Sequence, residues 1–151
     1  MKKLFLLTIL LFPLLMLSQK NYWQQQANYT MEIDVDVDNH TYSGSQKLVF
    51  TNNSPETLQR VFYHLYFNAF KPGTDLEQNS RHSTDDSRTM SKNILMLDEK
   101  DWGDVQIKWM LQDGKPIEFK VEETILDVVL EKPIKSGEST TLEMEFYVQT
   151  P

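Results

Sequence analysis

The sequence contains no cysteine among its 151 residues, which excludes disulfide bonds, thiolate metal sites and cysteine nucleophiles. Its 5 glycines form neither a phosphate-binding loop nor a G-x-S-x-G nucleophile elbow. Basic residues are also scarce, with 15 Lys and Arg against 22 Asp and Glu and a formal net charge of −7. Because phosphate binding depends on clustered Lys and Arg, nucleic acid is excluded as an expected partner.

Long apolar runs are absent except at the start of the chain. Two lysines precede an apolar stretch from Leu4 to Leu17, and Ser18 follows it. This pattern predicts a secretory signal peptide over residues 1–18, because a membrane-spanning helix needs about 20 apolar residues. We therefore expect export to a bacterial periplasm, cell envelope or medium, and no membrane span after cleavage. A cysteine-free exported chain suits a bacterial envelope.

Three aspartates alternate in the segment MEIDVDVDNH, at positions 34, 36 and 38. A calcium loop of the EF-hand type would also need Gly at its sixth position and Glu at its twelfth, where this chain has Asn39 and Ser45. Apolar and polar residues alternate from Tyr29 to Val37, which instead predicts a half-buried strand with its acids in water. A turn at Asp38-Asn39 ends it.

Similar alternation recurs along the chain and predicts six or seven strands. The further expected strands cover residues 41–51, 58–67, 105–111, 117–121, 125–130 and 142–148. The strand 58–67 is apolar on both faces and is expected at the centre of the sheet, whereas 105–111 and 117–121 should form a hairpin about Asp113-Gly114. Gly44 marks a bulge or a close approach. Residues 68–93 lack periodicity and read as a functional or mobile loop. The fold class is all-β, an antiparallel sandwich or saddle-like open sheet, with residues 19–151 as one β-domain that is incomplete at its carboxyl end.

Residues that could carry chemistry are few. The three histidines, His40, His64 and His82, have no partner at the spacing of a helical zinc pair. We therefore predict no catalytic residue and no metal ligand, leave substrate-binding residues unknown, and expect His64 to be a hydrogen-bonded core residue.

Two side-chain groups could bind a ligand, although a plainer role is favoured for each. Six aromatic residues could stack on sugars but are more often core: Tyr63, Tyr66, Phe67, Phe70, Trp102 and Trp109. A mixed-charge group in the 68–93 segment is more typical of a solvated surface than of a binding site: Arg81, His82, Asp85, Asp86 and Arg88.

The order of strand patterns from Tyr29 to Gly73, with the run NNSPETLQRVFYHLYFNAF and the later LEKPIKSGESTTLEMEFYV, resembles a known family. It is similar to the amino-terminal β-domain of the zinc aminopeptidases that include aminopeptidase N, especially exported members from the Bacteroidetes. The resemblance covers roughly residues 20–150. It implies a saddle-like β-structure that packs against a catalytic domain, where zinc sits on an H-E-x-x-H helix and a G-x-M-E-N strand holds the substrate's amine.

Neither of those motifs occurs in this sequence, so no family site residue is carried over and no cofactor is expected in this chain. The leading interpretation is a non-catalytic β-domain segment of an exported zinc metallo-aminopeptidase-like protein, which supports and partly walls a peptide-binding cleft. Its implied partners are a catalytic peptidase domain absent from this chain, and peptides. The alternative is a free-standing secreted β-sandwich that binds glycan or protein. An uncovered apolar patch is expected of the first and a self-contained polar surface of the second.

Overall fold

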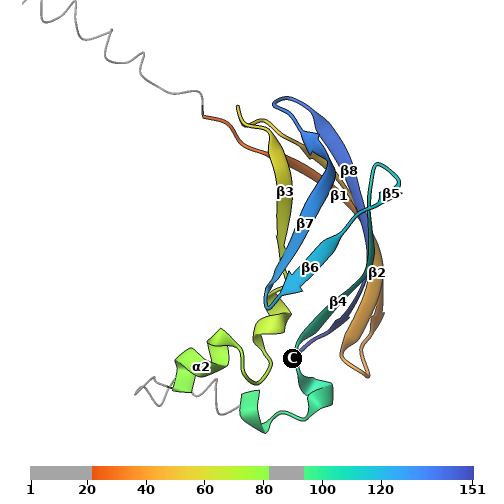
Figure 1. The fold of residues 1–151 in the computed structure, drawn as a ribbon. Coiled ribbons are helices and arrows are strands. Elements are labelled where there is room, and N and C mark those ends of the chain that lie inside the picture. The colour runs from red at the N-terminus through yellow and green to blue at the C-terminus, as the bar shows by residue number, and fades with distance from the viewer. Residues whose placement is uncertain (1–21, 82–93) are drawn as a thin grey trace, which may run out of the picture.

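A computed structural model describes residues 22–81 and 94–151, which form two antiparallel β-sheets (Figure 1). The larger sheet has the strand order β1 (Gln26–Asp36), β2 (Thr41–Thr51), β8 (Ser139–Gln149), β4 (Asp104–Gln112) and β5 (Lys115–Pro116). The smaller sheet has the order β3 (Leu58–His64), β7 (Ile125–Ile134) and β6 (Phe119–Glu122). The predicted all-β class is confirmed.

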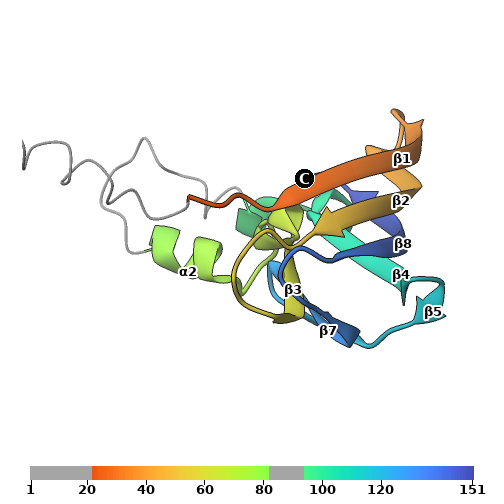
Figure 2. The same ribbon diagram turned by 90° about the horizontal axis from the view of Figure 1, so that it is seen from above.

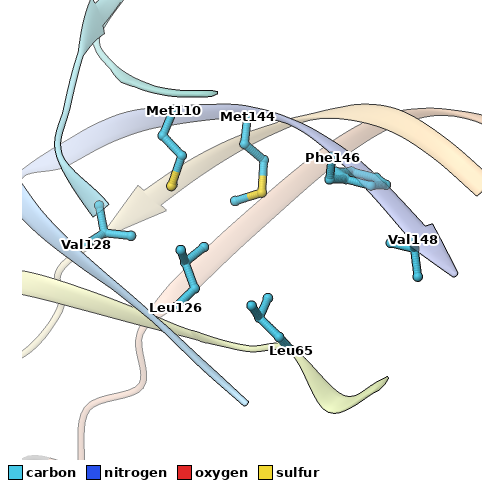
Figure 3. Close-up of a cluster of buried hydrophobic side chains, with 7 residues drawn as sticks. All are labelled: Leu65, Met110, Leu126, Val128, Met144, Phe146 and Val148. Carbon is cyan, nitrogen blue, oxygen red and sulfur yellow. The ribbon is translucent and has the colours of Figure 1, made fainter. Parts of the chain in front are cut away.

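The small sheet stands against one face of the large sheet, and β1 is the strand of the large sheet farthest from it (Figure 2). The core lies between the two sheets. Strand β8 shows the clearest alternation, because Leu142, Met144, Phe146 and Val148 are all buried while the residues between them are partly exposed. From the opposite side, Leu126 and Val128 of β7 and Leu65 point toward these side chains (Figure 3). A second cluster continues the core at the other end: Leu48, Leu130, Ile134 and Leu142.

The prediction for the first strand is half right. Strand β1 forms and its turn follows, with the Asp36 carboxylate accepting from the backbone N–H of Asn39 at 3.1 Å. The odd-numbered apolar side chains share the inward face with β2 residues such as Leu48, as the register requires. They are not buried, however, and Ile33 remains 50 % exposed. The prediction of a half-buried strand is wrong because β1 is an edge strand that the small sheet does not cover.

The prediction that residues 58–67 form the central strand is also wrong. Strand β3 ends at His64 and lies at an edge of the small sheet, whereas β8 and β7 hold the interior positions. Its outward residue Phe62 is 62 % exposed, and the inward residues Val61 and Tyr63 are only partly buried, so β3 is covered on one face at most. The chain then turns into a short helix, η1 (Tyr66–Ala69). Asn68 of η1 donates to the carbonyl of Glu123 and accepts from the N–H of Val105, which ties η1 to both sheets.

The expected hairpin about Asp113-Gly114 forms only at its tip. Strand β5 pairs with β4 for two residues, after which the chain crosses to the small sheet as β6. Pro116 occupies this crossing and lacks the N–H that a longer ladder would use. Gly44 lies in a regular register without a bulge, and a Cβ there would come within 2.3 Å of the Glu32 carbonyl oxygen, so the expected close approach is confirmed.

Besides η1, short helices that the sequence did not predict include α2 (Asp75–Arg81) and η3 (Glu99–Asp101). Residues 82–93 and the predicted signal peptide lie outside the described residues. Within the described ranges, no helix combines the length and hydropathy that crossing a bilayer requires.

Candidate functional site: an apolar groove beside the edge strand

A groove of about 400 Å³ opens between the two sheets. Large apolar and aromatic side chains line most of it, from strands that are distant in sequence. The lining residues are Met31 and Ile33 of β1, Tyr42 and Gln46 of β2, Tyr63 and His64 of β3, Leu65, Tyr66 and Phe67 after it, Val105 and Ile107 of β4, Leu126 of β7, and Met144, Phe146 and Val148 of β8. The floor of the groove is therefore the core itself, left open on the side of β1.

The inward side chains of β1, together with Val37 just after it, form an apolar stripe, of which Met31 and Ile33 line the groove. This stripe consists of Tyr29, Met31, Ile33, Val35 and Val37, whose exposed fractions run from 46 % to 74 %. A row of adjacent apolar side chains with this exposure is unusual for a surface that stays in water, because contiguous apolar patches mark interaction sites. The stripe and the groove together form one apolar surface.

Two polar atoms of groove residues are buried and have no hydrogen-bond partner in the part of the chain that the structure describes: the side-chain amide nitrogen of Gln46 and the phenol oxygen of Tyr63. Gln46 occupies an inward position of β2 opposite Met31 and Met144. Burial, and secondarily the neighbouring Tyr29, raises the pKa of Tyr63 well above its ordinary value, so the phenol stays a neutral donor. Buried polar groups of this kind are normally satisfied. The groove therefore contains two hydrogen-bonding atoms that the described residues leave unpaired.

His64 stands at the rim of the groove and stacks on Tyr66, with ring centroids 5.2 Å apart and an interplanar angle of 12°. Both side chains are exposed, so the expectation that His64 is a core histidine is wrong. His64 is exposed because it lies on the outward face of β3, an edge strand of the small sheet. His40 lies in the turn after β1, where its backbone carbonyl accepts from Thr150.

The six aromatic residues do not form one platform. Tyr63 and Phe67 pack against the core, which agrees with the core expectation. Phe70 and Trp102 are only partly buried and belong to neither of the two core clusters. Tyr66 is 72 % exposed and Trp109 is 40 % exposed, so for these two the core expectation is wrong. Trp109 lies on the outer face of the large sheet, where its indole N–H donates to Glu145 at 2.9 Å. Of the mixed-charge group, Asp85, Asp86, Arg88 and His82 lie outside the described residues, and the side chain of Arg81 is not described.

The outer face of the large sheet is polar and acidic around Gly44. A shallow hollow of about 380 Å³ over Gly44 is bordered by Glu32, Asp34 and Glu145. Lys108 donates to Glu145 at 2.7 Å and, with the Trp109 bond, lowers the pKa of that carboxyl. Neither Glu32 nor Asp34 takes part in an ion pair with any residue of the described ranges. The acids of β1 thus face water, as the strand pattern predicts.

The described part of the chain contains no group of three or more His, Asp or Glu side chains that could hold a metal ion. The apolar lining of the groove and the exposed apolar stripe beside it favour binding of another molecule by shape and apolar contact. The groove itself was not predicted, although one indication was present: Gln46 is a polar residue at an inward position of an alternating strand.

No protein-family model matches the chain, and no curated protein matches its sequence. Its structure, however, is similar to solved structures of zinc metallopeptidases. The M1 zinc metallopeptidase from Deinococcus radiodurans aligns with a TM-score of 0.52 and 16 % identity, covering 84 % of this chain and 20 % of that chain. A mutant of that enzyme bound to a Tyr-Ser-Ala substrate gives the same TM-score with 15 % identity, over 84 % of this chain and 21 % of that one. The chain thus shares the fold of a segment that spans about a fifth of these metallopeptidases.

Proposed function

We propose that this chain is a non-catalytic, amino-terminal β-portion of an exported zinc metallopeptidase-like protein. In that protein it supports and partly walls a peptide-binding cleft that further polypeptide completes. The observation that carries the proposal is the extent of the structural similarity, which takes in 84 % of this chain but only 21 % of a zinc metallopeptidase. A match with these proportions is what a supporting segment of such a protein would give.

The apolar surface around β1 supports the same proposal. A free-standing glycan-binding or protein-binding sandwich would be expected to close its core, whereas this sheet leaves an apolar stripe and an open groove in water. Covering apolar area contributes about 25 cal/mol per Å² removed from water, so further polypeptide packed on this face would stabilise the assembly.

Catalysis is assigned to the further polypeptide. The described residues of this chain do not fit a zinc ion, because they lack a ligand set of three or more suitable side chains. Their contribution is to hold a wall of the cleft in place.

The coding DNA beyond codon 151 tests the proposal. We expect an open reading frame that continues in phase and encodes an H-E-x-x-H motif followed by a more distant Glu. As a control on the assignment of catalysis, the 151-residue chain should release no amino acid from aminoacyl-anilide substrates, with or without added zinc. A stop codon directly after codon 151 in the intact gene, or zinc-dependent turnover by this chain that is lost on His64→Ala, would contradict the proposal.

A further inference from the structure

Within residues 22–81 and 94–151, strand β1 leaves one long edge of the large sheet free. Among these residues it pairs with β2 alone, in an unbroken register over eleven residues from Gln26 to Asp36. On its other side, every second backbone N–H and C=O points away from the sheet. Exposed edges are normally protected by short length, lysine, proline, a bulge or an inward-pointing charge. The sequence of β1, QANYTMEIDVD, has none of these features. The edge is therefore shaped to accept another strand.

The two faces of β1 specify what that strand should look like. Its inward side chains, such as Met31 and Ile33, are apolar and border the groove, whereas its outward Glu32 and Asp34 are acidic and exposed. Cross-strand neighbours on one face of a sheet lie about 5 Å apart, so opposite charges there attract and like charges repel. The complementary strand alternates apolar residues, which enter the groove, with basic residues, which lie beside these acids.

Charge also decides between possible occupants. A second copy of this chain, added antiparallel through its own β1, would bring the acidic outward faces of two strands together. Two chains of formal net charge −7 would also repel each other over longer distances. A basic strand avoids both the local repulsion between acidic faces and the long-range repulsion between two acidic chains. The observations thus favour a basic and apolar segment of other sequence over a homodimer.

The groove behind the edge supplies a further point of recognition. The amide nitrogen of Gln46 and the phenol oxygen of Tyr63 are buried there with no partner among the described residues, and both can donate a hydrogen bond. An oxygen on one inward side chain of the added strand, a threonine hydroxyl for instance, can accept from one of them. Satisfying a buried donor favours the bound state, because the unpaired donor is costly.

We propose that β1 is a docking edge for one additional β-strand, supplied by a segment that alternates apolar and basic residues. This inference rests on the proposed function, which supplies the segment from the further polypeptide. Binding by strand addition would close the groove and convert β1 from an edge strand into an interior strand.

The test uses the full chain and a synthetic peptide, acetyl-Val-Lys-Val-Lys-Thr-Lys-Val-Lys-Val-amide, whose central Thr lies on the same face as its Val residues. We expect it to slow hydrogen exchange at alternate amides of β1, those that point away from β2, and to leave the other amides of β1 unchanged. A peptide with Glu in place of every Lys should bind at least about tenfold more weakly, which corresponds to about 1.4 kcal/mol. Replacing the central Thr by Pro should also weaken binding, because Pro cannot donate to the new ladder.

A matched pair of variants locates the site on the protein. Ile33 and Val129 are 50 % and 49 % exposed, but Ile33 borders the groove and Val129 lies on the outer face of the small sheet. Ile33→Lys should weaken peptide binding at least about tenfold, and Val129→Lys should leave it unchanged. Strand addition would be overturned by any of three results. These are equal effects of the two variants on peptide binding, equal binding of the Lys and Glu peptides, or no slowing of hydrogen exchange at alternate amides of β1. Any of these results would leave the proposed function to be decided separately, by the reading frame beyond codon 151.

Discussion

Leu126 offers the sharpest test of the two-sheet core. It lies in β7, the middle strand of the small sheet, is 0 % exposed, and points toward Met110 and Met144 of the large sheet (Figure 3). Emptying such a site usually costs about 2 to 5 kcal/mol, from lost burial and from the cavity that remains. Flexible methionine side chains can fill part of that cavity. We therefore expect Leu126→Ala to lower the free energy of unfolding by about 3 kcal/mol.

Urea unfolding followed by tryptophan fluorescence measures this loss. With a denaturant slope of about 2 kcal/mol per M, a loss of about 3 kcal/mol lowers the midpoint by about 1.5 M. The control is Val129→Thr, on the same strand but facing outward at 49 % exposure, which should change stability by less than about 0.5 kcal/mol. If Leu126→Ala unfolds at the parent midpoint, or if Val129→Thr costs as much, the placement of the small sheet on the large one is wrong.

Three further predictions follow from local geometry. Gly44→Ala should destabilise the sheet by about 1 to 3 kcal/mol and loosen β1, measured as faster amide exchange there, because its Cβ would meet the Glu32 carbonyl at 2.3 Å; unchanged exchange in β1 would refute the close approach. Asn52→Ala should cost more than about 2 kcal/mol in urea unfolding, because the fully buried amide donates to two backbone carbonyls that would lose their partner; a cost below 1 kcal/mol would contradict these bonds. The pKa of Glu145 is lowered, so the stabilisation from its bonds is complete above pH 4.5 and is lost as pH falls through the lowered value; the Trp109 indole N–H resonance should shift only below that pH, and Glu145→Gln should abolish the shift.

The sequence predicts best those strands in which the alternating apolar residues are also the buried residues. In β8, every second residue from Leu142 to Val148 is apolar and buried, because the strand lies inside one sheet with a second sheet over one face. The bounds of β2 were likewise predictable, from the turns before Thr41 and after Thr51.

Alternation tells which side chains share a face, but it does not tell whether another layer covers that face. The pattern of β1 is as regular as that of β8, yet Val35 stays 62 % exposed because nothing in the described chain lies over it. The same limit explains β3, where Phe62 reads as core in the sequence and lies in water at an edge of the small sheet. The groove could not be predicted because it joins β1, β3 and β8, whose proximity is set by tertiary packing.

The central claim is that further polypeptide covers the apolar face of β1 in the native protein, and oxidation of methionine by hydrogen peroxide tests it most directly. Met31 on that face is 46 % exposed, Met96 elsewhere is 80 % exposed, and Met110 and Met144 are buried in the core. Peptide mass spectrometry would compare the isolated chain with the protein purified from its source cells. We expect Met31 to oxidise readily in the isolated chain and slowly in the native protein, with Met96 as the exposed reference and Met110 as the buried one. Oxidation of Met31 at the same rate in both samples would contradict the claim.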